Sequence, residues 1–256
     1  MINFTALCLF FLSLTCNAYN YFAGSCDLNV GMSDSNVLAL SSQPGFCQTY
    51  GYEAGKPECR HLSKKSYQSS HFTLHGLWPN QNACGQRYGF CSTKQQNHHC
   101  DYAPLELSPN VSADLKKIMP GYQYGSCLER HEWNKHGSCQ ILSVDNYFSL
   151  AMRLVTEADQ SVFGQYVTQN MGKKVSLTVL KNKISESFGK KNAGKVFLGC
   201  KNGVLVDIYI QLPALIVFNE SLESLIDEAS NPQYRDACPR TVTLSAFSKD
   251  AVMALV

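Results

Sequence analysis

Two short segments of the sequence carry residues that can transfer protons and stabilise negative charge. HEWNKHGSC (131–139) contains two histidines, a glutamate and a lysine within six residues, and SHFTLHGLWPN (70–80) contains His75 close to Trp78. Imidazole can serve as a general base or a general acid near neutral pH, and an ammonium group can stabilise charge that develops in a transition state. Neither segment carries a nucleophilic serine or cysteine motif. Together they indicate phosphoryl chemistry that needs no metal.

The segment before Gly137 is predicted to form one short helix, from Cys127 to His136. Ser126 and Glu129 have the spacing of a capping box, in which Ser126 is the N-cap residue. Gly137 is a natural residue to follow the last helical turn. The helix should therefore have a defined beginning and a defined end.

This predicted helix places several polar side chains on one broad face. Glu132 and His136 are four residues apart, and so are His131 and Lys135, so the two rows lie side by side. Trp133 points elsewhere and can anchor the helix in the core. The helix dipole and Glu132 both favour a protonated His136. Two histidines in opposite protonation states would give a bell-shaped pH profile, and the charge favoured on His136 places the expected optimum on the acidic side of neutral.

A metal site is the main alternative interpretation of the histidine-rich segments. His131 and His136 are five residues apart, whereas the H-E-x-x-H motif of metalloproteases requires four, so the two rings do not converge on one ion. CSTKQQNHHC (91–100) invites a zinc interpretation through His98 and His99, but the chain has no C-x-x-C pair. Each segment alone also has an ordinary structural explanation, as an exposed charged helix or a strand-end histidine. We expect neither a metal nor a cofactor.

Several segments are predicted to be strands of one sheet. The pair Asn202-Gly203 predicts a tight turn between antiparallel neighbours. The segment that carries His75 alternates polar and apolar residues, as on a half-buried strand, and Gly76 and Pro79 are expected to end it. The other predicted strands lie at 36–42, 196–200 and 204–212.

Apolar stripes with helical spacing predict the remaining elements. Asp145 is the expected N-cap of the clearest of these helices. The predicted helices lie at 112–121, 144–158, 176–189 and 222–229, and a terminal strand should follow them. Strands and helices do not alternate regularly, which favours an α+β domain over a doubly wound sheet.

The first residues of the chain are typical of a secretory signal. MINFTALCLFFLSLTCNA (1–18) has an apolar run too short to span a membrane, with a small-residue context at Ala18. We expect a signal peptide at 1–18, a single domain at 19–256, and export to the periplasm or the medium. No later segment is apolar enough to cross a bilayer, so no membrane association is expected. The formal net charge of +2 excludes a general basic field, so local groups must hold any anionic ligand.

Cysteine usage agrees with export. The chain has 12 cysteines, and removal of Cys8 and Cys16 with the signal leaves an even number for disulfides. The domain is long enough to bury a core, so the bridges would fasten loops rather than replace a core.

The two histidine segments, FTLHGLWP and HEWNKHGSC, resemble the two active-site segments of the ribonuclease T2 family. The resemblance extends through VLALSSQPGFCQ (37–48), ECR (58–60), LELSPNVSADLKKIMPG (105–121) and SCLERHEWNKHGSC (126–139), and is strongest to bacterial periplasmic members of the ribonuclease I type. It implies a single α+β domain with a central antiparallel sheet flanked by helices and fastened by disulfides. It also implies a monomer that acts on RNA.

The resemblance further implies a chemistry. The 2′-OH of RNA attacks the adjacent phosphate to form a 2′,3′-cyclic phosphate, which is then hydrolysed to a 3′-phosphate, with low base specificity. DNA lacks the 2′-OH and should not react. By position in the motifs, His136 would be the general base and His75 the general acid. Glu132 and Lys135 would stabilise the transition state.

Two further residues would bind substrate. His131 would contact a phosphate, and Trp78 would stack on a base, a contact that tolerates every base. The alternative function is a ribonuclease-fold binding or toxin-like module with incidental catalysis. The presence of both histidines disfavours that alternative.

The resemblance also bears on the disulfides. It implies the pairs Cys47–Cys59 and Cys200–Cys238. Cys26 and Cys84 are additional to the bacterial pattern, and we expect them to pair with each other. The remaining cysteines form two more bridges whose pairing stays open, and these are Cys91, Cys100, Cys127 and Cys139.

Overall fold

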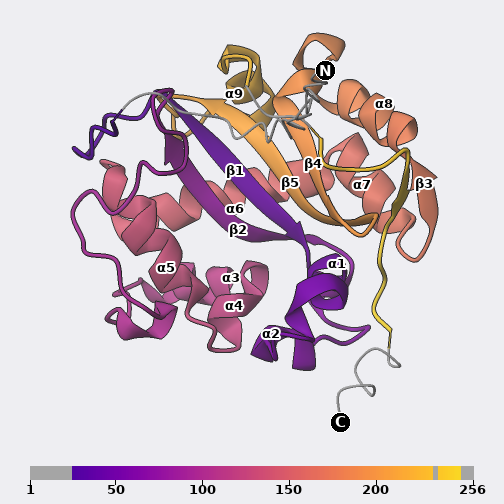
Figure 1. Ribbon diagram of the computed structural model, residues 1–256, viewed down its shortest axis with the longest axis horizontal. Coiled ribbons are helices and arrows are strands. Elements are labelled where there is room, and N and C mark those ends of the chain that lie inside the picture. Colours follow the sequence, from indigo (N-terminus) through magenta and orange to yellow (C-terminus); the bar gives the residue numbers. More distant parts are fainter. Residues whose placement is uncertain (1–24, 233–235, 249–256) are drawn as a thin grey trace, which may run out of the picture.

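A computed structural model describes residues 25–232 and 236–248, and the predicted signal peptide lies outside the described residues. Figure 1 shows long strands lying side by side, with α6 crossing behind them. The strands are β1 (Ser35–Ser42), β2 (Phe72–Asn80), β3 (Lys174–Ser176), β4 (Val196–Lys201), β5 (Val204–Pro213) and β6 (Thr241–Thr243). No helix in the described part of the chain is long and apolar enough to span a membrane.

The sheet is built around β1, which pairs with β2 on one side and β5 on the other, both antiparallel. β4 and β5 form the predicted hairpin through Asn202 and Gly203, both of which have positive φ. The predicted antiparallel sheet is confirmed, with one exception. β5 meets β6 in a parallel pairing at Val204 and Thr243. The strand that carries His75 does not end at Gly76 or Pro79 as predicted, because β2 continues through Asn80 along β1.

The helices cover the sheet and extend beyond its edges. The longer ones are α3 (Pro109–Ile118), α5 (Leu128–Lys135), α6 (Val144–Gln160), α7 (Val162–Gln169), α8 (Leu177–Phe188) and α9 (Leu222–Glu228). Single-turn helices are α1 (Gln43–Phe46), α2 (Pro57–Arg60) and α4 (Pro120–Gln123). Shorter helical turns lie at Cys47–Gly51, Tyr67–Ser69, His99–Asp101, Gly137–Cys139 and Lys190–Lys195.

Two predicted N-caps are wrong. α6 is capped by Ser143, whose side chain accepts a hydrogen bond from Asn146 N, while Asp145 accepts one from Ser108 N at 3.0 Å. α5 has no capping box, because Ser126 donates its hydroxyl to Glu58 in α2. In both cases a tertiary partner takes the side chain that local spacing assigned to the cap.

The two faces of the sheet have different environments. One face packs against α6 and its neighbours in the main apolar core, which includes Leu38 and Leu74. The opposite face carries a smaller apolar cluster of Val37, Ala39 and Trp78, with Tyr209 packed against it. The polar side chains discussed below lie on this second face.

All ten cysteines of the described region form disulfides, which join Cys26–Cys84, Cys47–Cys59, Cys91–Cys139, Cys100–Cys127 and Cys200–Cys238. Three of these are the expected pairs, and the other two resolve the pairing that the sequence left open. Bridging of Cys91 and Cys100 removes both thiolates from the zinc alternative. Within the described residues, no group of three His, Cys, Asp or Glu is arranged to hold a metal ion.

Candidate active site

A β-bulge in β2 positions His75. Ala39 pairs with Gly76 and Leu40 pairs with Leu74, so His75 is an extra residue with no partner on β1. A bulge redirects the side chains that follow it. Leu74 therefore remains in the core, while His75 and Gly76 both face the second side of the sheet.

Glu132 of α5 reaches this face through the space that Gly76 leaves open. Trp78 Nε1 donates a hydrogen bond of 2.7 Å to Glu132 Oε2, and the glutamate is 1% exposed. A Cβ atom at position 76 would lie 1.9 Å from Glu132 Oε2 and 2.4 Å from Trp78 Nε1. Only glycine fits there. Burial raises the pKa of Glu132 to about 7, although His75, Trp78 and Lys135 oppose that shift.

His75 lies between two carboxylates. Its Nδ1 is 3.7 Å from Asp207 Oδ1 and its Nε2 is 4.0 Å from Glu132 Oε1, while its side chain remains 36% exposed. Ser41 donates a hydrogen bond of 2.9 Å to Asp207 Oδ1 and holds that carboxylate in place. Burial alone would lower the pKa of His75, but Asp207 and Glu132 outweigh it and the pKa is raised. The geometry favours a protonated ring.

His136 has the opposite electrostatic setting. It is 2% exposed, and its buried Nδ1 has no hydrogen-bond partner among the described residues. Burial lowers its pKa well below the ordinary value, and Lys135, His131 and His75 lower it further. The sequence-based expectation of a protonated His136 is therefore wrong, because loss of water outweighs the helix dipole. His136 remains a neutral base at neutral pH.

Trp78 joins the two histidines. Its ring stacks on His136 with centroids 5.4 Å apart and meets His75 edge-on at 5.0 Å. The residue is 7% exposed, so it offers no open face to a base and the predicted stacking role is not supported by this geometry. Trp78 instead contacts both histidines and fixes Glu132 through its indole N–H.

His131 does not provide a cation for a phosphate. It stacks on His99, with ring centroids 4.1 Å apart, and lies 6.4 Å from the His136 ring. Burial contributes most to lowering its pKa, His99, Lys135 and His75 add to the shift, and together they bring the pKa to about 3. The ring is thus neutral at neutral pH, so a contact with phosphate could use only a neutral N–H donor.

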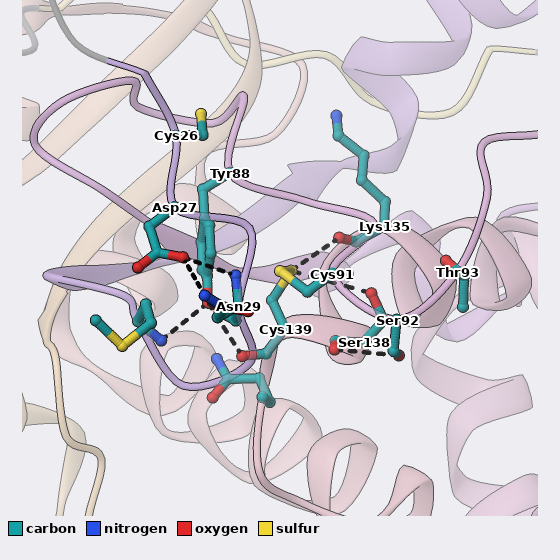
Figure 2. Close-up of a disulfide and its surroundings, with 12 residues drawn as sticks. Cys26, Asp27, Asn29, Tyr88, Cys91, Ser92, Thr93, Lys135, Ser138 and Cys139 are labelled. Carbon is teal, nitrogen blue, oxygen red and sulfur yellow. Dashed lines mark hydrogen bonds between the residues drawn. A yellow bond between two sulfur atoms is a disulfide. The ribbon is translucent and has the colours of Figure 1, made fainter.

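Lys135 is held by the loop that precedes Cys91. Phe90 N donates a hydrogen bond of 2.8 Å to Lys135 O, and the disulfide Cys91–Cys139 fastens this loop behind α5. Figure 2 shows the Lys135 side chain extending away from that disulfide. The positive charge of Lys135 contributes to lowering the pKa of each of four neighbouring groups, which are His75, His131, Glu132 and His136. Tyr88 of the same loop is fully buried and donates a hydrogen bond to Asn29 O.

A cavity of about 180 Å³ opens beside His75. Its walls combine apolar and polar side chains from β1, β2, α1, α2, α4, α5 and the turn His99–Asp101, with the residues next to them. They include Gln43, Phe46, Lys56, Glu58, Thr73, Leu74, His75, His99, Pro120, Ser126 and Leu128. A concave and largely apolar space with a few convergent polar groups is typical of a ligand site.

The structure brings His75, Glu132, Lys135 and His136, which the sequence predicted as catalytic, to one site, and it adds Asp207 and Glu58, which the sequence did not single out as site residues. Asp207 occupies a polar position in the alternating pattern of β5. That pattern predicts which face of the sheet carries Asp207, but it does not predict that the carboxylate lies next to His75. Glu58 lies in ECR, a segment noticed only for its resemblance. His99 was considered as a zinc ligand or a loop residue, and it packs on His131 instead.

Comparisons with known proteins match the chain to one family. The Ribonuclease T2 family model matches residues 33–228. Ribonuclease I of Escherichia coli (strain K12) is 32% identical over 206 residues, which cover 72% of this chain and 76% of that protein. The T2 ribonuclease Actibind gives a TM-score of 0.55 at 16% identity, covering 87% of this chain and 92% of that one. RNase NT in complex with 5′-AMP gives 0.53 at 16% identity, covering 84% and 99%.

Proposed function

The chain belongs to the ribonuclease T2 family and is an endoribonuclease, and we propose that it cleaves single-stranded RNA by metal-independent transphosphorylation. The observation that carries the mechanism is the placement of His75 and His136 on two sides of Trp78 in opposite electrostatic settings. Two titratable groups whose surroundings push their pKa values apart form a natural acid and base pair.

In the proposed reaction, neutral His136 removes the proton from the 2′-OH. The 2′-oxygen attacks phosphorus as the bond to the 5′-oxygen breaks, and protonated His75 gives its Nε2 proton to that leaving oxygen. Lys135 and Glu132 stabilise the pentacovalent phosphorus. The 2′,3′-cyclic phosphate is then hydrolysed to a 3′-phosphate with the roles of the two histidines reversed.

Asp207 orients the proposed acid. A carboxylate on Nδ1 keeps the proton-bearing Nε2 directed to the other side of the ring, where Glu132 lies. Asp207 is therefore a positioning residue in this scheme. It acts through His75 and does not touch the reacting atoms.

The cavity beside His75 would hold the base of a nucleotide next to the scissile phosphate. The solved relative RNase NT binds 5′-AMP, which supports a nucleotide as the ligand class. Bases in a duplex are paired and stacked, so a cavity of this kind favours single strands. We propose cleavage next to every base, at rates that can differ between bases.

The protein is proposed to act outside the reducing cytoplasm, in the periplasm or the medium. Five disulfides in the described region favour an oxidising compartment. We also propose that it acts as a monomer and does not cleave DNA.

Cleavage of RNA in excess EDTA tests the proposed reaction. We expect full activity with the chelator, early products that end in 2′,3′-cyclic phosphates, and no cleavage of DNA of the same sequence. Mass spectrometry of a short oligonucleotide digest identifies the product ends. Activity that EDTA abolishes, or cleavage of the DNA strand, would refute the mechanism.

The pH dependence of kcat/KM tests the two protonation states. The active form needs neutral His136, whose pKa is lowered, and protonated His75, whose pKa is raised. Activity should therefore persist well below pH 6.5 and decline as the pH rises above the raised pKa of His75. Asp207→Asn removes a negative charge beside His75, so its alkaline limb should move to lower pH while the acidic limb stays in place. Asp236→Asn, away from the site, is the control. An unmoved alkaline limb in Asp207→Asn would exclude the positioning role.

A further inference from the structure

The cavity beside His75 contains a buried carboxylate that the proposed reaction does not use. Glu58 of α2 is 5% exposed and lines the cavity together with His75. Ser126 Oγ donates to Glu58 Oε2, and this is the one hydrogen bond that the described residues give to the carboxylate. Burying a carboxylate costs free energy unless donors or cations satisfy it. The unused acceptor positions of Glu58 therefore suit a ligand that brings N–H donors.

The rest of the cavity suits a flat ring. Phe46, Leu74, Pro120 and Leu128 contribute apolar walls, and Glu58 is the one carboxylate among the lining residues. Lys56 also lines the cavity, and its charge contributes to lowering the pKa of His99. That lysine offsets the repulsion between Glu58 and the phosphates of RNA.

From this geometry we propose that Glu58 makes guanine the preferred base in the cavity. The inference rests on the proposed function, because it assumes that a nucleotide enters there. The Watson–Crick edge of guanine carries adjacent N1–H and N2–H donors, which a carboxylate accepts together. Adenine and cytosine offer one amino group beside a ring acceptor. Uracil offers one N–H between two carbonyl oxygens, which a carboxylate repels.

Ser126 is the positioning partner of Glu58. Its hydroxyl occupies one acceptor position of Oε2, while a carboxylate has about four such positions. Enough acceptor capacity remains for two donors from a base. The residue that sequence analysis assigned to a helix cap thus orients the group that reads the base.

Equilibrium binding of 5′-GMP, 5′-AMP, 5′-CMP and 5′-UMP tests the proposal without relying on catalysis. Isothermal titration of the whole protein should give a Kd for 5′-GMP about tenfold below that for 5′-UMP, a difference of about 1.4 kcal/mol. Glu58→Gln keeps the shape but replaces an acceptor oxygen with a donor. It should lose most of the guanine preference and bind 5′-UMP at least as well as the wild type does. Glu53→Gln, an exposed acid in the same segment, should change neither affinity.

Two outcomes would overturn the inference. One is equal binding of all four nucleotides by the wild-type protein, and the other is an unchanged preference in Glu58→Gln. If Glu58→Gln does not fold, Ser126→Ala is used in its place. We expect it to reduce the preference for 5′-GMP over 5′-UMP, measured as the ratio of their Kd values, by about threefold. RNA cleavage by the same wild-type preparation is measured separately. Guanine selection without cleavage would refute the proposed function alone, and cleavage without selection would refute this inference alone.

Discussion

Replacing His136 with alanine is expected to lower kcat on RNA by about 10³-fold, because it removes the proposed base for the 2′-OH proton. His75→Ala should cause a loss of similar size through the missing general acid. His136 is 2% exposed, so its truncation also leaves a cavity beside Trp78 that costs about 1–3 kcal/mol of stability. Single-turnover rates measured well below the melting temperature of each variant separate the chemical defect from the stability defect.

The two variants can be told apart by their leaving groups. An aryl ester of a nucleoside 3′-phosphate has a leaving group that needs no proton, so His75→Ala should recover most of its lost rate on it. His136→Ala should remain impaired on both substrates, because attack by the 2′-OH still requires a base. Recovery of both variants, or of neither, would contradict the assignment of base and acid.

His71→Ala is the matched control. His71 lies in the same segment as His75, but its Nδ1 bonds to Asp159 at 2.7 Å on the far side of the bulge. Its ring is 41% exposed and contacts Tyr67 rather than the site. We expect nearly full activity from this variant. A large loss would show that replacing a histidine of this segment with alanine disturbs the neighbouring sheet.

The proposed catalytic face of α5 could be predicted because the pattern that forms it is local in the sequence. Helical spacing alone places Glu132 beside His136, and alternation alone places His75 on a half-buried strand. The bulge could not be predicted, since it exists only in the register between β2 and β1. The contact between Asp207 and His75 could not be predicted for the same reason. It meets His75 because Ser41 pairs with Asp207 across β1 and β5, and these strands are far apart in the sequence.

Where local rules failed, a long-range partner decided the outcome. Ser126 had the spacing of an N-cap, but a buried carboxylate from α2 took its hydroxyl. Cys127 has φ of +54° and is bonded to Cys100. The helix therefore begins after a residue in the left-handed backbone conformation, whereas the N-cap residue of a capping box is extended. Trp78 resembled a base-stacking residue by type and position. It is instead buried, bonded to Glu132 and packed against the rings of both His75 and His136.

Gly76→Ala should be the most damaging substitution outside the titratable residues. The added methyl group would overlap Glu132 Oε2 and Trp78 Nε1, which are both less than 2.5 Å from the Cβ position. We expect a loss of about 10²-fold in kcat and about 1–3 kcal/mol of stability, because neither neighbour has room to move within the buried face. Gly194→Ala is the control, since a Cβ there meets nothing within 4 Å.

A double-mutant cycle decides whether the effect of Gly76→Ala passes through Glu132. Glu132→Ala removes the carboxylate that the new methyl group would strike, and it frees the Trp78 indole from its hydrogen bond so that the ring can shift. If displacement of Glu132 is the cause, adding Gly76→Ala to Glu132→Ala should cost little further rate, and the two losses should be far from additive. Additive losses would mean that alanine at 76 acts by distorting the bulge itself. The position of the His75 side chain would then depend more on the backbone conformation at Gly76 than on the Glu132 carboxylate next to it.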